Sequence, residues 1–357
     1  MFWINGDTTS HTGKKISKGM ERSAFLSSLD KLKEAILASQ TALDEVYIKS
    51  EQNNSWFIRR FLEASIDAIL QQFIDQDKCR RWLQSYLEKN SQPRRVGLIM
   101  AGNIPLVGFH DLFCVLAAGH KAVIKLSDKD PWLLPFVTDQ WKRVCPELED
   151  HITYVERLDK IDTVIATGSN NSGRYFEYYF RQFPHLFRQN RNGVAFLTGK
   201  ESMTDLKNLA KDVFIFFGLG CRNVSKIYVP AGYDFSQWQE VIAEWSFLGD
   251  HNKYRNNLDY NYAIYLINSV PHINLGHLIL KEDDAIVSRI GCLHYSYYDD
   301  QSKVESELHQ RRDEIQCVIS GSPLASWEHV TFSETQNPRL DQYADGVDTM
   351  QFLTTLD

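Results

Sequence analysis

The chain has 357 residues, of which 43% are hydrophobic and 24% charged, and its formal net charge is −7. This length exceeds what one ordinary hydrophobic core accommodates and predicts two domains. A weakly acidic chain argues against nucleic-acid or anionic-membrane binding, because both need a positive field. No run of about 18 apolar residues is present, so we expect no membrane span.

The N-terminus and the cysteines indicate the compartment. The first seven residues lack the basic region and apolar stretch of a signal peptide. Six cysteines are scattered along the chain without CxxC spacing, which is typical of free thiols in a reducing environment and not of a disulfide scaffold. They form no zinc-ligand pattern either. We therefore expect a cytoplasmic protein without a bound metal.

Residues 21–90 carry apolar side chains at three- and four-residue steps, a spacing that predicts helices. Asn90-Ser91-Gln92-Pro93 then ends the pattern. We expect residues 1–92 to form a tail and a helical segment that packs on the domain following it.

Residues 93–192 alternate between strand and helix patterns. Short apolar runs at 95–100, 122–126 and 163–167 each lead into a loop with glycine, serine or another polar residue. Helix-like stretches separate them, and this alternation predicts a doubly wound parallel sheet. Such sheets bind ligands at the carboxyl edge of their strands, where these loops would lie.

Residues 193–325 continue the alternation and predict a second α/β domain, followed by a C-terminal segment at 326–357. The expected helix lies near 205–210. The expected strands are the apolar runs 194–197, 213–217, 226–230, 262–267 and 315–320.

Cys221 is the best candidate for a nucleophile. It follows Gly218-Leu219-Gly220, which lets the backbone turn tightly, and it precedes Arg222. A helix beginning after this turn, together with Arg222, would lower the pKa of the thiol. A thiolate suits covalent acyl transfer. The alternative is a small buried core residue, which is what we expect for the other five cysteines.

Three further positions suit a cofactor-dependent reaction. The Asn103 side chain, after the first strand, can donate a hydrogen bond to an oxyanion, although a turn-forming role is the alternative. Lys125 stands in an apolar strand and needs a partner such as a cofactor ribose or phosphate. Gly168 and Ser169 precede a helical stretch and offer backbone donors for a pyrophosphate, although Gly-x-Gly-x-x-Gly is absent.

Taken in order, five motifs resemble the aldehyde dehydrogenase superfamily over about residues 55–353. They are Asn103-Ile104-Pro105-Leu106, Lys125-Leu126-Ser127-Asp128, Thr167-Gly168-Ser169, Gly218-Leu219-Gly220-Cys221 and Asp313-Glu314-Ile315. The residues of these motifs are most similar to those of the LuxC-type acyl-CoA reductases, which make fatty aldehydes. Three further stretches resemble that branch: Phe109-His110-Asp111, the strand motif around Lys125, and Tyr343-Ala344-Asp345-Gly346-Val347-Asp348.

The resemblance implies an aldehyde-dehydrogenase-like fold, with a Rossmann-type cofactor domain at 93–192 and the catalytic domain at 193–325. It also implies the roles of the site residues. These are Cys221 as nucleophile, Asn103 in the oxyanion hole, Lys125, Ser127 and Asp128 at the cofactor ribose, Gly168 and Ser169 at the pyrophosphate, and Glu314 at the nicotinamide ribose. The implied cofactor is NADPH. NADH is the alternative, because Asp128 would repel a 2′-phosphate unless Lys125 and Lys129 offset its charge.

One departure from the superfamily bears on the direction of the reaction. Phe196 stands where oxidising members carry a general-base Glu, and Glu201 is the nearest substitute. Without a base to activate water, an acyl-Cys221 thioester would hydrolyse poorly. We therefore expect NADPH-dependent reduction of an acyl-CoA to an aldehyde through acyl-Cys221. The alternatives are an oxidising aldehyde dehydrogenase and a non-catalytic acyl-transfer or assembly partner. A homodimer is expected from the superfamily's habit.

Overall fold

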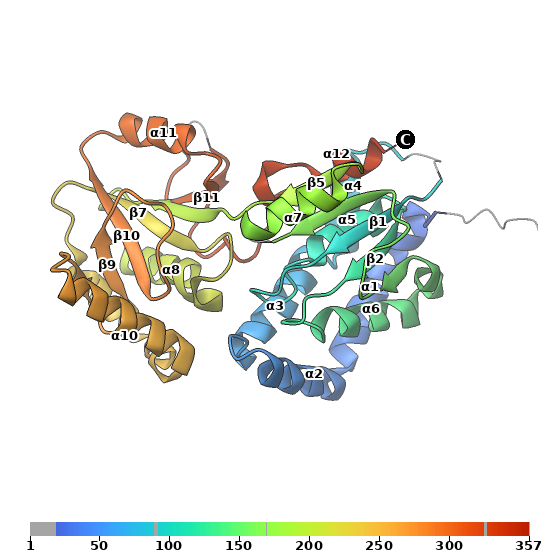
Figure 1. Cartoon of the computed structure of the whole chain (residues 1–357), viewed down its shortest axis with the longest axis horizontal. Coiled ribbons are helices and arrows are strands. Elements are labelled where there is room, and N and C mark those ends of the chain that lie inside the picture. The colour runs from blue at the N-terminus through green and yellow to red at the C-terminus, as the bar shows by residue number, and fades with distance from the viewer. Residues whose placement is uncertain (1–18, 89–91, 169, 325–326, 357) are drawn as a thin grey trace, which may run out of the picture.

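The computed structural model describes residues 19–88, 92–168, 170–324 and 327–356. Two lobes lie side by side, each built around one β-sheet (Figure 1). The first lobe contains the N-terminal helices and a five-stranded sheet, and the second contains a seven-stranded sheet. In this described part of the chain, the helices are too short or too polar to cross a membrane.

The helical segment predicted for residues 21–90 is present, and in the described part of the chain before the first strand it consists of four helices. They are α1 (Arg22–Ala38), α2 (Gln40–Asn53), α3 (Arg59–Gln72) and α4 (Gln76–Leu83). The apolar residues of α1 recur on one face, and Phe25, Leu29, Leu32 and Ile36 are fully buried. This face packs on the helices of the first lobe, so the N-terminal segment belongs to the same core as the first sheet.

The first sheet is entirely parallel and has the order β3-β2-β1-β4-β5. Its strands are β1 (Arg95–Ile99), β2 (Lys121–Lys125), β3 (Ile152–Tyr154), β4 (Thr163–Thr167) and β5 (His185–Arg188). The chain winds outward from β1 in both directions, so the strand order reverses between β1 and β4. Such a reversal opens a crevice at the carboxyl edge, where doubly wound sheets bind their ligands.

Helices cover both faces of this sheet. Between its strands run α5 (Phe109–Ala117), α6 (Leu133–Val144) and α7 (Asn170–Phe180), with a 3-10 turn at Pro146–Asp150. Ala122 and Ile124 of β2 face the core that contains α1, α5 and α6, whereas Val123 faces a smaller cluster with Phe176 and Phe180 of α7. This alternation follows from the period-two geometry of a strand.

The second sheet has the order β12-β11-β6-β7-β10-β9-β8 and is parallel except for the β8–β9 pair. Its strands are β6 (Asn192–Phe196), β7 (Val224–Pro230), β8 (Ile273–Asn274), β9 (Ile279–Glu282), β10 (Cys292–Tyr298), β11 (Ile315–Ser320) and β12 (His329–Val330). The helices of this lobe are α8 (Met203–Phe214), α9 (Trp238–Ala243), α10 (Asn252–Ile267) and α11 (Gln301–Gln310), with 3-10 turns at Ile215–Gly218, Phe235–Gln237 and Ser246–Asp250.

The two faces of the second sheet have separate cores. Ala195 and Ile227 pack with α8, α9 and α10 in the larger one. Val194, Phe196 and Tyr228 pack on the opposite face with α11. The side of the strand on which a residue lies therefore decides which core it joins.

Two strands predicted from apolar runs are wrong. Residues 213–217 contain the last two residues of α8 and then enter the 3-10 turn Ile215–Gly218. Residues 262–267 form the C-terminal part of α10, in which Tyr265 is buried while Leu266 and Ile267 are exposed. A five- or six-residue apolar run carries no period that separates a strand from one flank of a helix.

The C-terminal segment returns from the second lobe to the first. After β12 it passes through a 3-10 turn at Ala344–Gly346 and ends in α12 (Thr349–Thr354), which packs on α5 (Figure 1). The Tyr343 hydroxyl accepts a hydrogen bond from Trp82 Nε1 at 2.8 Å. Residues 326–357, predicted as a separate segment, thus contribute β12 to one lobe and α12 to the other.

Candidate active site

The loop after β1 carries Asn103 to the carboxyl edge of the first sheet. Its shape depends on Leu106, which has a left-handed backbone (φ 56°) and whose N–H donates to Asp130 Oδ2 at 2.9 Å. Burial raises the pKa of Asp130 to about 6. Gly102 allows the loop to approach β2, since a Cβ there would lie 2.5 Å from Ser127 Oγ. The neighbouring residues therefore fix where Asn103 stands.

The Asn103 side chain crosses from the first lobe to the loop that carries Cys221. Its Nδ2 donates to the carbonyl oxygen of Leu219 at 2.8 Å, although residue 103 lies in a loop of the first lobe and residue 219 in a loop of the second. A primary amide nitrogen has two donors, so one N–H is left for a ligand.

Lys125, Ser127 and Asp128 follow one another at the carboxyl end of β2. Lys125 is half-buried, and its Nζ makes no hydrogen bond or ion pair with another residue that the structure describes. The Asp128 side chain is exposed, and its backbone carbonyl accepts from Asn53 Nδ2 at 2.8 Å. A half-buried cation without a protein partner is suited to an anionic or hydroxyl-rich ligand.

The loop after β4 leads directly into α7. Gly168 lies one residue beyond the strand, and the helix begins at Asn170. Ser169 lies outside the described residues, so only Gly168 of this predicted pair can be placed. The N-terminus of an 11-residue helix next to a glycine is a suitable anion site because its N–H groups are unpaired.

The Cys221 loop is held by one buried amide. Phe216 and Phe217 both have left-handed backbones with φ of 57°. Asn223 Oδ1 accepts from the Gly220 N–H at 2.8 Å, and its Nδ2 donates to the Ile215 carbonyl at 2.9 Å. A Cβ on Gly220 would lie 2.9 Å from Asn223 Oδ1, so this position needs glycine.

The prediction of a thiol with lowered pKa is wrong. No helix begins after Cys221; the chain turns and enters β7 at Val224. Burial raises the pKa of the Cys221 thiol, the positive charge of Arg222 opposes this, and the negative charge of Asp345 adds to it. Acting as a nucleophile, this thiol would need help to lose its proton. The other five cysteines are buried, as predicted.

Two cavities meet at Cys221. The larger, of about 660 Å³, lies between the lobes and is lined by Lys125, Ser127, Asp128 and Gly168 from the first lobe. The smaller, of about 230 Å³, lies in the second lobe, and its wall mixes apolar side chains, such as Val213, Phe217 and Leu278, with polar ones, such as Asn190, Arg191 and Arg289. Asn103, Leu219 and Cys221 line both. Cys221 can therefore be reached from two sides.

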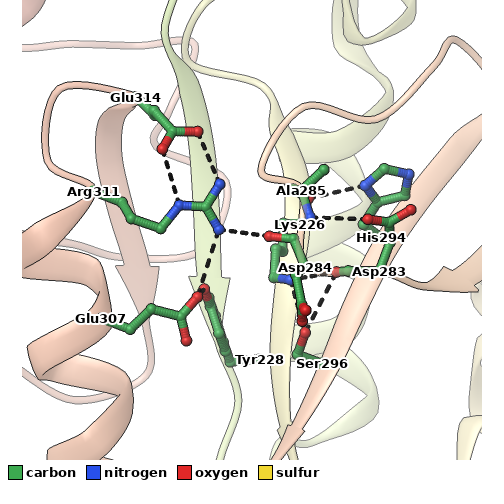
Figure 2. A network of polar contacts seen from close by, with 10 residues as sticks. All are labelled: Lys226, Tyr228, Asp283, Asp284, Ala285, His294, Ser296, Glu307, Arg311 and Glu314. Carbon is green, nitrogen blue, oxygen red and sulfur yellow. Dashed lines mark hydrogen bonds and ion pairs between the residues drawn. The ribbon is translucent and has the colours of Figure 1, made fainter.

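Glu314 is not brought to either cavity. It lies just before β11, half-exposed, and Arg311 donates to both of its carboxylate oxygens at 3.0 and 2.8 Å (Figure 2). This ion pair lowers the pKa of Glu314. The same guanidinium contacts Glu307 of α11, so Glu314 belongs to a polar network on the α11 side of the second sheet.

An aromatic ring stands at the position that the sequence resemblance matches to the general-base Glu of oxidising members. Phe196, at the end of β6, is buried and stacks on Tyr298 with ring centroids 4.8 Å apart. Glu201 does not replace it, because its carboxylate accepts from the backbone N–H groups of Thr198 and Gly199 and lines neither cavity. Neither Phe196 nor Glu201 therefore offers a carboxylate to Cys221.

The C-terminal segment and β5 contribute residues that we did not predict for the site. Arg188, Gln336, Gln342 and Asp345 line the larger cavity together with Cys221. Asp345 stands in the Tyr343–Asp348 motif, and the available sequence signal was the Asp345-Gly346 pair, which is typical of a tight turn; the backbone of Asp345 is left-handed there (φ 58°). Among the described residues, no group of three or more His, Cys, Asp or Glu side chains is arranged to hold a metal ion.

No family model matches the sequence, and no curated protein matches it. Solved structures do. A putative aldehyde dehydrogenase, PutA from Anabaena variabilis, is 16% identical, with a TM-score of 0.61 over 84% of this chain and 74% of its own. A Mycobacterium tuberculosis aldehyde dehydrogenase complexed with NAD+ is 12% identical, with a TM-score of 0.60 over 84% and 73%. Aldehyde dehydrogenase 21 from Physcomitrella patens, in complex with the reaction product succinate, is 11% identical, with a TM-score of 0.63 over 94% and 84%.

These neighbours are aldehyde dehydrogenase superfamily members, and at such low identity they bear on the fold alone. The parallel first sheet and the second, mixed sheet agree with them. The predicted fold class is confirmed: the chain has the aldehyde-dehydrogenase-like fold.

Proposed function

We propose that this protein is a nicotinamide-dependent oxidoreductase that reduces an acyl-CoA to an aldehyde through a thioester on Cys221. The observation that carries the proposal is the position of Cys221 and Asn103 at the junction of two cavities. The larger cavity, at the strand ends of the first sheet, suits a dinucleotide, and the apolar side chains in the wall of the smaller one, such as Val213, Phe217 and Leu278, would contact an acyl chain.

The residues of the larger cavity fit a nicotinamide dinucleotide. Lys125 presents a cation that has no partner among the described residues, Gly102 keeps the loop close to β2, and Gly168 precedes the N-terminus of α7. Lys125 and Asp128 would bind the ribose, and the backbone around Gly168 would bind the pyrophosphate. We propose NADPH, with Lys125 and Lys129 offsetting the charge of Asp128 at the 2′-phosphate, and NADH as the alternative.

The first step is acyl transfer to Cys221. The deprotonated Sγ attacks the thioester carbon of the acyl-CoA, and the negative charge develops on the carbonyl oxygen. The Cys221 backbone N–H and the second N–H of Asn103 would stabilise this oxyanion. Because Leu219 accepts the other Asn103 N–H at 2.8 Å, the amide is already oriented before substrate binds. CoA then leaves as the thiol.

The second step releases the aldehyde. When bound, the reduced nicotinamide supplies a hydride to the acyl carbon. Asn103 holds the oxyanion again while the bond from that carbon to Cys221 Sγ breaks. Phe196 favours this outcome over hydrolysis, because a buried ring at this position cannot take a proton from water. The protein thus orients the thioester and limits its hydrolysis.

The direct test mixes the protein with NADPH or NADH and a panel of acyl-CoAs from acetyl to palmitoyl, and follows absorbance of the reduced cofactor. Oxidation of the cofactor with formation of the matching aldehyde is the expected result. Oxidised cofactor consumed with an aldehyde, and no reaction with any acyl-CoA, would instead support an oxidising dehydrogenase. Acyl labelling without cofactor turnover would support an acyl-transfer role.

The nucleophile is tested with Cys221→Ala, which should abolish labelling by radioactive acyl-CoA while cofactor binding persists. Cys145→Ala is the matched control, because Cys145 is a core cysteine at the end of α6. Acyl-enzyme formed without cofactor should be long-lived when trapped with acid at timed intervals. Rapid hydrolysis would contradict the reductive direction.

A further inference from the structure

Asp345 is a carboxylate in the wall of the cavity that contains Cys221, and the acyl-transfer scheme above does not use it. It lies in the short turn between β12 and α12, in the segment that returns from the second lobe to the first. Its side chain is 7% exposed. A carboxylate buried in the wall of the same cavity as a thiol is a candidate for exchanging protons with it.

The surroundings hold Asp345 by one carboxylate oxygen and leave the other free. Oδ2 accepts from the backbone N–H of Gln189 at 2.8 Å. The backbone N–H of Asp345 donates to Gln316 Oε1 at 3.1 Å. The nearest charged atom to Oδ1 is Arg191 Nε at 3.6 Å, which is beyond hydrogen-bond distance. Among the described residues, Oδ1 therefore accepts no hydrogen bond.

The same segment is attached to the nucleophile loop. Arg222, which follows Cys221, donates to the Gln342 carbonyl at 2.6 Å, three residues before Asp345. Arg188 donates to the Ala344 carbonyl at 2.8 Å from the side of β5. Asp345 and Cys221 are thus held on adjoining elements of one cavity wall, although they are far apart in the sequence.

The charges around this pair come from several elements. Burial and Asp111 of α5 raise the pKa of Asp345, while Arg188 of β5 and Arg191 lower it. Burial and the charge of Asp345 raise the pKa of Cys221, while Arg222 and Arg188 lower it. A buried thiol with a raised pKa is mostly protonated at neutral pH, so acylation benefits from a nearby base.

We propose that Asp345 is the acid–base residue of the acyl-transfer step. Its Oδ1 takes the proton from Cys221 Sγ as Sγ bonds to the acyl carbon. The bond from that carbon to the CoA sulfur then breaks, and Asp345 returns the proton to the departing thiolate. One thioester is exchanged for another, no electrons are transferred, and the carboxylate ends as it began. This inference rests on the proposed acyl-Cys221 intermediate.

Asp345→Asn is the informative variant. Asn tolerates the left-handed backbone, and its Oδ1 can still accept from the Gln189 N–H, so the turn is retained. Two reactions of Cys221 are compared over pH 5–10: acylation by the fastest-labelling member of the acyl-CoA panel, and alkylation by iodoacetamide. Only acylation needs a proton for its leaving group, because iodide leaves unprotonated.

The two reactions should respond in opposite ways. Acylation at pH 7 should fall about a hundredfold, at the low end of what a positioned base contributes. Alkylation should not slow, and its pH midpoint should move down, because the Asp345 charge that raises the pKa of the thiol is gone. Asp341→Asn, which removes an exposed carboxylate on the same segment, should change neither.

Equal losses in both reactions would mean that Asp345 only shapes the site, and unchanged acylation would remove its role; either result overturns the inference. Arg191→Gln leaves the carboxylate in place and removes its nearest cation. It should move the rising limb of acylation to higher pH, and an unmoved limb would also overturn the inference. If no acyl-CoA labels the unmodified protein, the proposed function fails and this inference fails with it. If the unmodified protein is labelled and the variant matches it, only the inference fails.

Discussion

The two loops that meet at Cys221, residues 102–106 and 215–221, are each stabilised by one buried polar side chain, but the two side chains differ in chemistry. Each contains left-handed backbone that one buried side chain holds in place. At residues 102–106 the acceptor is a carboxylate, Asp130, whose pKa burial raises to about 6. At residues 215–221 it is an amide, Asn223, which accepts one hydrogen bond and donates others. The first support titrates in the physiological range, and the second does not.

The difference separates two demands on the site. In the proposed mechanism, the loop with Cys221 must keep its shape through every protonation state of the reaction, and a neutral amide with saturated partners provides that. In the same mechanism, the loop with Asn103 only supplies a donor from the opposite lobe and tolerates a support whose charge changes. The variants below test this division, beginning with the largest expected effect.

Asn223→Ala should be the most damaging change to either loop. It removes the acceptor of the Gly220 N–H and the donor to the Asp212 and Ile215 carbonyls, all in a buried setting. Unpaired buried groups cost about 1–3 kcal/mol each, so we expect a loss of about 3–6 kcal/mol in the free energy of unfolding. Denaturant titration measures this free energy, and Asn256→Ala, which changes an exposed residue of α10, is the control. A loss below 1 kcal/mol would contradict the role assigned to this amide.

Asn103→Ala should leave stability almost unchanged and reduce chemistry instead. Loss of one oxyanion donor typically costs about 10²–10³-fold in rate, or about 3–4 kcal/mol in the barrier. Single-turnover acylation measures it, and Asn103→Asp, with an acceptor in place of the donor, should be at least as slow. If Asn103→Ala acylates at the unmodified rate, the hydrogen bond to Leu219 is the whole function of this side chain.

The first loop was more predictable than the second, for a physical reason. In a parallel doubly wound sheet, the residues after each strand meet at one edge, so Asn103, Lys125 and Gly168 could be grouped from local patterns alone. The Cys221 loop depends on contacts between lobes. The pKa of the thiol is raised by burial and by the charge of Asp345, which comes from the C-terminal segment. No sequence period encodes these contacts.

The same reason explains the remaining errors. Glu314 follows the superfamily motif, yet Arg311, three residues earlier in the chain, holds its carboxylate on the α11 side of the second sheet (Figure 2). The apolar run at 262–267 is a helix flank, because α10 packs its buried side on the second sheet. Motif spacing identified positions along the chain, and the direction of each side chain was decided by packing.

The titrating support makes a pH prediction for the first loop. The pKa of Asp130 is raised from 3.8 unfolded to about 6 folded, so the folded protein binds the proton more tightly. Its stabilising contribution is complete below about pH 4 and disappears as pH rises through 6. The change approaches about 3 kcal/mol for a shift of this size. The unfolding free energies of the unmodified protein and of Asp130→Asn should be measured from pH 4 to 8. The difference between them should change by about 3 kcal/mol over this range. A difference that stays constant with pH would contradict the raised pKa of Asp130.

Lys125→Ala should produce the smallest effect, and it tests whether the first loop's side of the cavity binds the cofactor. Lys125 and Lys121 stand at opposite ends of β2, and both are half-buried. Only Lys125 lies at the carboxyl edge that lines the larger cavity. A charge-assisted hydrogen bond to a ligand is worth about 1.5–3 kcal/mol, so removing it should weaken nicotinamide binding at least tenfold, while Lys121→Ala should leave it unchanged.

Fluorescence titration with NADPH and with NADH provides the dissociation constants. A larger loss for NADPH would show that Lys125 also offsets the 2′-phosphate charge, and equal losses would assign it to the ribose alone. Acylation of Cys221 by acyl-CoA without cofactor should keep its rate, because that step uses the other side of the junction. Unchanged affinity for both cofactors would separate Lys125 from the cofactor and move the binding site away from the β2 edge.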